Sequence, residues 1–334
     1  MGDPAGIGPE IAVKGLAHKK TGDLCLPIIF GDAGVIKQAV SISGRNLDIY
    51  PIEEISKAKF EPGLINVFDL KNVDNAALKP GVVSPEAGAA AFEAIKAVID
   101  YALKGEIAAT VTCPMHKEAL NLAGYKFAGH TEIYAHLTNT KDYAMLLVEQ
   151  NLRIVHVSTH TSLRRACDLV KKQRIIKVIE LGEEVCKKLG IANPRIGVAG
   201  LNPHASDGGL FGLEEKDEII PAIETAKASG INVQGPVPAD TLFAKAKGGS
   251  YDLVVAMYHD QGHIPLKLLG FNWNEKEQKW QAVTGVNITL GLPIIRTSVD
   301  HGTAFDIAGK GVASEKSLLM AIEYAVKLAG APKH

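Results

Sequence analysis

The amino-acid sequence predicts an α/β fold with a largely parallel sheet, divided between two lobes. Short runs of β-branched and aliphatic residues alternate with segments of helical periodicity through most of the 334 residues. This alternation is typical of strand–helix–strand units. The chain is also longer than one compact core usually spans, so we expect two lobes. We find no internal repeat and no low-complexity linker in the sequence.

The individual elements follow from local signals. Leu26–Phe30 is predicted to be a strand that ends at Gly31, and Ser84–Leu103 is predicted to be a helix. Ser84 suits the N-cap of that helix, Pro85 suits its first position, and Gly105 ends it. Further strands are predicted at Ile107–Thr112, Tyr143–Val148, Arg153–Ser158, Arg195–Ala199 and Leu253–Met257, with helices at Ile175–Leu189 and Glu214–Ala228.

The composition excludes several classes of protein. The chain has 36 basic and 37 acidic side chains, so neither a nucleic-acid surface nor a membrane surface is indicated. No apolar run approaches the roughly 18 residues of a spanning helix, and no leader opens the chain. The four cysteines form no paired motif and are interpreted as reduced thiols of a cytoplasmic protein, or as small buried apolar residues: Cys25, Cys113, Cys167 and Cys186.

The opening segment Gly2–Glu10 is rich in glycine. It matches neither a dinucleotide fingerprint nor a Walker A sequence. It could be a phosphate-binding turn, or a turn that leads into a helix with Pro9 in its first turn. Such a turn normally follows a strand, and none precedes it here, so a natural first strand before Met1 is a further expectation.

Three histidines each follow an apolar predicted strand. His160 follows Arg153–Ser158, His204 follows Arg195–Ala199, and His259 follows Leu253–Met257. The carboxyl ends of strands line the ligand crevice of open α/β sheets. Three imidazoles there would bind a divalent metal and leave positions open for substrate. The alternative is that the three are unrelated polar loop residues.

A metal at that place would have a definite chemical use. It could hold a hydroxyl and a carboxylate of one substrate, and then stabilise the enolate that decarboxylation leaves. Asp260 and Asp207 could orient the imidazoles, or could be solvated loop carboxylates. Three imidazoles accept several ions, so Zn, Mg, Mn, Co and Ni are not distinguished.

The loop Asp300–Gly311 suits a nucleotide. A histidine can contact adenine, and an aspartate can accept from ribose hydroxyls while repelling a 2′-phosphate, so Asp306 favours NAD over NADP. A helix-starting turn is the alternative. The residues predicted to bind the cofactor are His301, Gly302, Thr303, Ala304 and Asp306.

Basic and polar residues could bind an anionic substrate. Lys267 lies in the segment after His259, and Arg296 closes a strongly apolar run, which argues against a solvated surface position. A solvated surface position is the alternative for the others. The predicted substrate ligands are His130, Thr131, Lys267, Asn287 and Arg296.

Taken together, these motifs resemble the 4-hydroxythreonine-4-phosphate dehydrogenase (PdxA) family nearly from end to end. The resemblance rests on Gly2–Glu10, Thr112–Lys117, Gly129–Glu132, His160, Asn202–His204, Tyr258–Gly262 and Gly285–Gly311. It implies a two-lobed α/β/α fold like that of isocitrate and isopropylmalate dehydrogenases. The first lobe would comprise 1–125 and 300–334 with both termini and the cofactor loop. The second, 126–299, would contain the metal and substrate residues and the dimer contacts.

The resemblance also implies a homodimer whose active site draws on both subunits, with His160, His204 and His259 as metal ligands. Two departures stand out: Asn202–Asp207 ends in Ala-Ser-Asp where the family has Ala-Gly-Glu, and Cys113 replaces a smaller residue. Extra residues at 271–284, which include Trp280, resemble the D-threonate or D-erythronate 4-phosphate dehydrogenase branch. The alternative for that insertion is a neutral surface hairpin.

The sequence therefore predicts NAD-dependent oxidation and decarboxylation of a small phosphorylated hydroxy acid. Lys267, or a hydroxide on the metal, would remove the hydroxyl proton, and Asp260 is the second predicted catalytic residue. The alternative substrate is 4-phosphohydroxy-L-threonine, from pyridoxal phosphate biosynthesis. Two other classes remain open: a metal-dependent lyase or phosphatase without NAD, and a catalytically silent binding protein for a phosphorylated ligand.

Overall fold

The computed structural model of the chain describes residues 1–276 and 279–330, apart from the side chains of 279–283. The chain forms two compact units: unit 1 is Met1–Thr140 with Leu292–His334, and unit 2 is Lys141–Gly291. The predicted boundaries, 125/126 and 299/300, differ from these. Segments 126–140 and 292–299 belong to unit 1 because Ile133 and Tyr134 form one apolar cluster with Phe92, and Leu292 packs against it.

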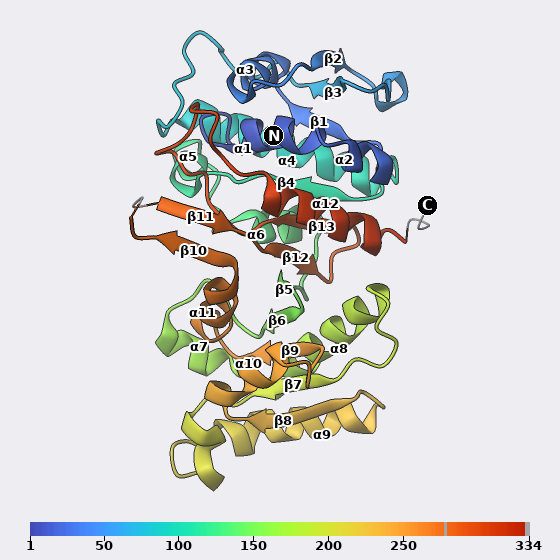
Figure 1. Ribbon diagram of the computed structural model, residues 1–334. Coiled ribbons are helices and arrows are strands. Elements are labelled where there is room, and N and C mark those ends of the chain that lie inside the picture. The colour runs from blue at the N-terminus through green and yellow to red at the C-terminus, as the bar shows by residue number, and fades with distance from the viewer. Residues whose placement is uncertain (277–278, 331–334) are drawn as a thin grey trace. The chain divides into compact units, whose positions relative to one another are not determined.

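Unit 1 contains two groups of parallel strands. The central strand β3 (Leu64–Asp69) lies between β1 (Ile28–Gly31) and β2 (Asp48–Ile52), and β4 (Thr110–Thr112) pairs with β13 (Arg296–Val299). Its helices are α1 (Gly8–Leu16), α2 (Lys19–Leu24), α3 (Ala33–Ser43), α4 (Pro85–Leu103), α5 (Lys117–Leu122), α6 (His130–Leu137) and α12 (Lys316–Leu328), with a 3-10 turn at Ile55–Lys57 (Figure 1).

The start of α4 has the predicted cap. The Ser84 side chain accepts a hydrogen bond from the backbone N–H of Ala87 at 3.1 Å, and Pro85 is the first helical residue. Beyond the helix, Gly105 has φ 75°, a conformation that favours glycine. The predicted helix Ser84–Leu103 is therefore confirmed, together with the chemistry of both its ends.

Unit 2 is built on strands in the order β12-β5-β6-β9-β7-β8. The strands from β6 to β8 are parallel to one another, whereas β5 is antiparallel to both β12 and β6. Their bounds are β5 (Ala144–Glu149), β6 (Leu152–His156), β7 (Ile196–Ala199), β8 (Val233–Val237), β9 (Leu253–Ala256) and β12 (Val286–Leu290).

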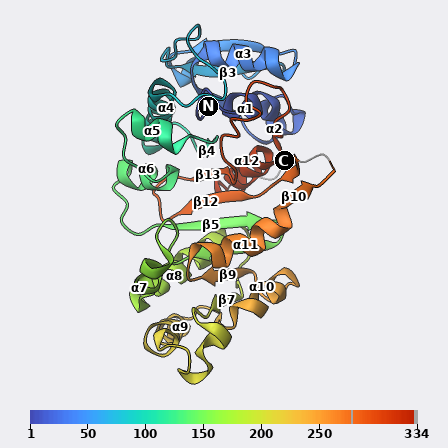
Figure 2. The same ribbon diagram turned by 90° about the vertical axis from the view of Figure 1, so that its left-hand side faces the viewer.

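Helices cover both faces of this sheet (Figure 2). Ile154 and Val254 join an apolar cluster with Leu242 of α10 and Leu266 of α11, whereas Val155 and Leu253 approach Gly182 of α8. Strands buried on both faces have continuous apolar runs, as the sequence of these strands does. The helical elements are α7 (Leu163–Leu169), α8 (Lys172–Lys188), α9 (Ile220–Ala228), α10 (Ala239–Lys247), α11 (His259–Gly270), a 3-10 segment (Pro203–Gly208) and a π-helical turn (Glu215–Ile219).

The insertion after α11 forms an antiparallel pair of strands. β10 (Phe271–Asn274) pairs with β11 (Lys279–Val283), while residues 277–278 and the side chain of Trp280 lie outside the described part of the chain. The backbone of the insertion is thus an antiparallel strand pair, as the hairpin alternative requires. Among the described helices, none combines the length and the apolar character that crossing a bilayer requires.

Candidate active site

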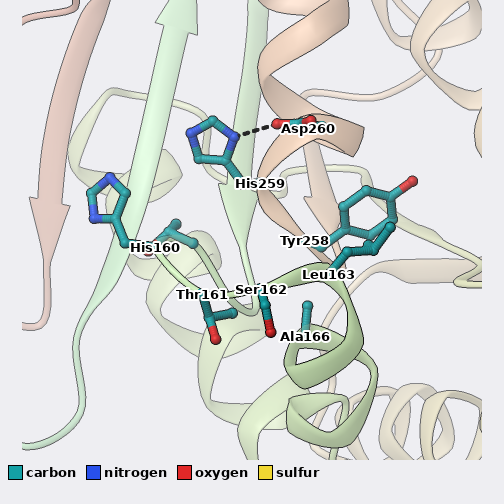
Figure 3. Close-up of a pocket in the computed structure, with 9 residues that line it drawn as sticks. His160, Thr161, Ser162, Leu163, Ala166, Tyr258, His259 and Asp260 are labelled. Atoms are coloured by element: carbon teal, nitrogen blue, oxygen red, sulfur yellow. Dashed lines mark hydrogen bonds and ion pairs between the residues drawn. The ribbon is translucent and has the colours of Figure 1, made fainter.

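Two of the three strand-end histidines lie close together. β6 and β9 are neighbouring parallel strands, so their carboxyl ends meet at the same edge of the sheet. His160 follows β6, His259 begins α11 just after β9, and their ring centroids are 6.1 Å apart. Both line one cavity of about 580 Å³ (Figure 3). Its other lining residues are Thr159, Thr161, Ser162, Leu163, Ala166, Tyr258 and Asp260.

The ring of His259 has a defined hydrogen-bonding state. Its Nδ1 lies 2.6 Å from Oδ1 of Asp260 (dashed in Figure 3), so Nδ1–H donates to the carboxylate. Nε2 then carries the free lone pair. A carboxylate on the far nitrogen is the usual partner of a metal-binding imidazole. The arrangement therefore agrees with Asp260 as an orienting residue.

The third histidine is placed differently. His204 follows β7, the next parallel strand beyond β9, but its ring lies beside that of Phe211, with 6.4 Å between the ring centroids. Residues His204 to Asp207 all have φ between 42° and 73°, a left-handed stretch without glycine. In the described part of the chain, no group of three or more His, Cys, Asp or Glu side chains is arranged to hold a metal ion.

The donors present nevertheless suit a divalent metal. When two imidazoles bind the same cation, each nitrogen lies about 2.1 Å from the metal. The centroids of the two rings are then roughly 5 to 6 Å apart. The 6.1 Å between the His160 and His259 centroids lies just above that range, so a small approach of the rings would bring both to one cation. His160 and His259 would supply two ligands, and His204 is the candidate for a third.

Sequence reasoning missed two further imidazoles behind His259. His263 stacks on His259 with centroids 3.6 Å apart and 11° between planes, and His156 lies 4.8 Å from His263. Burial lowers the pKa of His263 to about 3 and that of His156 to about 4. Both rings are therefore neutral at pH 7. The signal available in the sequence was the spacing of four residues between His259 and His263, which places both on one side of a helix.

The remaining predicted residues of unit 2 lie further along the chain. Lys267 is on α11, eight residues and so about 12 Å along the helix axis from His259. Its Nζ lies 4.9 Å from the centroid of the Phe271 ring. Asn287 is half-buried on β12, opposite Leu147 of β5.

Unit 1 holds a buried arginine. Arg296 on β13 is only 2% exposed, its Nη2 donates to Oγ1 of Thr112 at 2.8 Å, and its guanidinium lies 5.6 Å from the Tyr134 ring. Desolvation lowers the pKa of Arg296 to about 10. The prediction that Arg296 is no solvated surface residue is confirmed.

His130 begins α6, and Thr131 beside it is buried. Burial, followed by the charge of Arg296, holds the pKa of His130 well below its usual range. Nε2 of His130 is buried without a hydrogen-bond partner in the described chain. An unsatisfied imidazole nitrogen near a buried arginine is suited to an anionic or hydroxylated ligand.

The predicted cofactor loop packs against the opening segment. The backbone N–H of Ile7 donates to the Thr303 carbonyl at 3.0 Å, and a Cβ at Gly6 would come within 3.0 Å of the Thr303 Cβ. α1 begins at Gly8 with Pro9 in its first turn, as predicted. Burial lowers the pKa of His301, whereas Asp306 is exposed.

The proteins that this chain resembles are dehydrogenases, which identifies its class. A D-threonate 4-phosphate dehydrogenase of Salmonella typhimurium is 47% identical over 98% of this chain and 97% of its own length. One from Pectobacterium atrosepticum is 46% identical over 98% of both chains. The crystal structure of a Klebsiella pneumoniae 4-hydroxythreonine-4-phosphate dehydrogenase has a TM-score of 0.84 at 45% identity, covering 98% of both chains. The protein is therefore an oxidoreductase of the dehydrogenase type.

The family follows from a match over most of the chain. Residues 23–325 fit the family described as pyridoxal phosphate biosynthetic protein PdxA, and the chain belongs to that family. A terephthalate 1,2-cis-dihydrodiol dehydrogenase of Burkholderia xenovorans shares the fold at 32% identity, with a TM-score of 0.66 over 98% of this chain and 96% of its own. The predicted fold class, α/β of the isocitrate and isopropylmalate dehydrogenase type, is confirmed.

Proposed function

We propose that this protein is an NAD-dependent, metal-requiring dehydrogenase that oxidises and decarboxylates D-threonate 4-phosphate or D-erythronate 4-phosphate. The products are dihydroxyacetone phosphate and CO2. The observation that carries the proposal is the pairing of His160 and His259 at neighbouring strand ends, with Asp260 on the far nitrogen of His259. The names of the curated relatives support the substrate class.

The reaction balances as one oxidation followed by loss of the carboxyl group. A hydride leaves C3 for the nicotinamide, the C3 hydroxyl gives up its proton, and C3 becomes a ketone. The 3-keto acid then loses C1 as CO2, and C2 takes up a proton. When bound, NAD accepts the hydride and a divalent metal polarises oxygen atoms of the substrate.

In this proposal the protein's own residues bind and orient the charged ends of the substrate. Arg296 provides a buried, planar donor group for a carboxylate or phosphate, and His130 provides a neutral nitrogen beside it. Thr131 and Asn287 add hydrogen bonds, and Lys267 takes the hydroxyl proton. The loop His301–Asp306 binds the cofactor, with Asp306 on the ribose hydroxyls.

A second substrate has its own support. Solved structures with a TM-score of 0.84, such as the one from Klebsiella pneumoniae, are described as 4-hydroxythreonine-4-phosphate dehydrogenases. That substrate, 4-phosphohydroxy-L-threonine, differs from D-threonate 4-phosphate in its C2 substituent and stereochemistry. An amino group at C2 would be a cation in place of a neutral hydroxyl. The enzyme should therefore oxidise the two acids at clearly different rates.

A side-by-side assay tests the proposal. The purified protein is incubated with NAD, a divalent metal and each of the three phosphorylated acids, while NADH and CO2 are followed. We expect both products in equal amounts with one of the two sugar acids, and little NADH with 4-phosphohydroxy-L-threonine. Release of inorganic phosphate without NADH would instead indicate a phosphatase, and no turnover of any acid would indicate a binding protein.

We further propose that the enzyme is a cytoplasmic homodimer whose active site takes residues from both subunits. The support is the family membership and the four cysteines, which are all free thiols. Neither a nucleic acid nor a membrane is proposed as a partner, given the balanced charge of the chain. Light scattering of the purified protein measures the oligomeric state, and mixing two different inactive variants tests the shared site.

A further inference from the structure

α11 begins with a pair of imidazoles that touch face to face. His259 is its first residue and His263 follows one turn later, so the two side chains lie on the same side of the helix. Their ring centroids are 3.6 Å apart and their planes differ by 11°. Nδ1–H of His263 donates to the backbone carbonyl of His259 at 2.9 Å, which fixes the rotation of the His263 ring.

His263 is itself supported by the sheet. The ring of His156, on β6, lies 4.8 Å away and is 1% exposed, with Nδ1 at 3.3 Å from the Met145 carbonyl oxygen. Gly262 lets α11 approach β6 closely, because a Cβ there would lie 2.3 Å from Nε2 of His156. The three rings thus form a column that runs from a buried strand to the residue that lines the cavity.

The hydrogen bond from His259 to Asp260 is a weaker support. The Asp260 side chain is 69% exposed, so water competes for its carboxylate and can replace the bond. His263 is only 8% exposed, and its ring has His259 on one side and His156 4.8 Å away as a second neighbour. Stacked aromatic pairs contribute about 0.5–1.5 kcal/mol beyond the area that they bury. Of the two partners of the His259 ring, His263 is therefore the one that is shielded from water.

We propose that His263 is a positioning residue that holds the His259 ring in the plane required for a divalent cation shared with His160. The proposal rests on the proposed metal requirement of the enzyme. His263 touches neither cation nor substrate in this role. It keeps Nε2 of His259 aimed at one point, so that binding a cation does not first require the ring to be ordered.

Cobalt(II) titration of the metal-free protein tests the proposal without substrate or NAD. We expect His263→Ala to weaken Co²⁺ binding about 10- to 100-fold, as losses of supporting partners of metal-bound histidines do. The visible absorption band of the bound ion should also change, because its ligand geometry does. His263→Phe keeps a stacking ring and loses the hydrogen bond, so it should restore affinity to within about threefold and restore the band.

Two control variants separate the possible outcomes. His259→Ala should abolish the cobalt spectrum, and His136→Ala, an exposed histidine on α6, should leave it unchanged. Thermal unfolding of each variant shows whether it folds; if His263→Ala does not, the comparison between wild type, His263→Phe and His263→Gln decides.

If the wild type binds no Co²⁺, or His259→Ala binds it normally, the proposed metal function fails. If His259→Ala loses the ion while His263→Ala binds it with wild-type affinity and spectrum, the positioning role alone is refuted. A His263→Phe variant that is as weak as His263→Gln would also refute it.

Discussion

Lys14 and Glu10 form a buried ion pair in unit 1, with 2.7 Å between Nζ and Oε1 and side-chain exposures of 10% and 4%. The pair connects α1 to the segment after the cofactor loop. Nζ of Lys14 also donates to the carbonyls of Gly311 and Ala313, and Oε1 of Glu10 accepts from the Ala313 N–H. Two of the three ammonium hydrogens therefore fix the end of the predicted cofactor loop to the helix, and the third holds the Glu10 carboxylate within α1.

Replacing Lys14 by Met should destabilise the fold strongly. The substitution leaves the Glu10 carboxylate buried without its cation, which typically costs about 3–5 kcal/mol. If the loop binds NAD, the affinity for NAD should fall in the same variant. Chemical denaturation and NAD titration measure the two effects. Lys20→Met removes an exposed pair with Glu323 and should cost under about 1 kcal/mol; equal losses in the two variants would contradict the argument.

A second ion pair should make the stability of unit 2 depend on acid. Arg195 donates its backbone N–H, Nε–H and Nη2–H to the carboxylate of Asp252 at 2.9–3.0 Å. These bonds lower the pKa of Asp252 below its ordinary value. The contribution is therefore fully present above about pH 4, and is lost as the pH falls through the folded-state pKa. Asp252→Asn should cost about 1 kcal/mol at pH 7, with the difference from wild type vanishing near pH 2 in urea denaturation.

The buried imidazole of His156 should also weaken the fold in acid, but at a higher pH than Asp252 does. Its pKa is lowered to about 4, below the ordinary value of about 6.5. The unfolded chain takes up a proton below pH 6.5 while the folded chain does not, so stability falls as the pH drops from 6.5 to 4. His156→Phe should remove about 1 kcal/mol per pH unit from that slope between pH 6 and 5. His136→Ala provides the comparison, and an unchanged slope in His156→Phe would show that another group causes the dependence.

Arg296 should decide how tightly the substrate binds. Arg296→Met removes a buried charged donor whose partners include Thr112, and we expect the KM for the phosphorylated acid to rise about 100-fold. The exposed Arg165→Met should leave KM unchanged. Tyr134→Phe keeps the ring beside the guanidinium and loses only the hydrogen bond to Thr110, so its KM should change less than about tenfold. Steady-state kinetics of the three variants test this order.

The sequence predicts well whatever depends on short-range pattern. Apolar runs identify the strands of unit 2, and the cap of α4 follows from Ser84 and Pro85, because both are local signals. The boundaries of the two units are not local: Tyr134 and Leu292 are far apart in the chain, yet they share one apolar cluster. Contacts of that kind leave no mark on a single sequence.

In the candidate site too, the sequence predicts the features that depend on local pattern and not those that depend on distant contacts. Parallel strands explain why His160 and His259 meet, since strand ends can be found from the pattern of apolar residues. The turn at His204 could not be foreseen, because four consecutive left-handed residues without glycine run against local preference. His156 was overlooked because it lies within a strand, where an isolated histidine gives no signal of its neighbours.

The close approach of α11 to β6 at Gly262 should make an added methyl group destabilising. Glycine within a helix costs up to about 1 kcal/mol relative to alanine, so Gly262→Ala would be stabilising in an open position. Here the added Cβ would lie 2.3 Å from Nε2 of His156 and 2.8 Å from Cγ2 of Ile154, and both atoms belong to buried, well-packed side chains. The helix must move away from the sheet, and overpacking of this kind costs about 1–3 kcal/mol. We therefore expect a net loss of stability in urea denaturation, with weaker Co²⁺ binding because His259 moves with the helix. Gly22→Ala in α2, where a Cβ meets nothing within 4 Å, should be neutral or stabilising. A Gly262→Ala variant as stable as Gly22→Ala would mean that the helix and strand are not in contact as described.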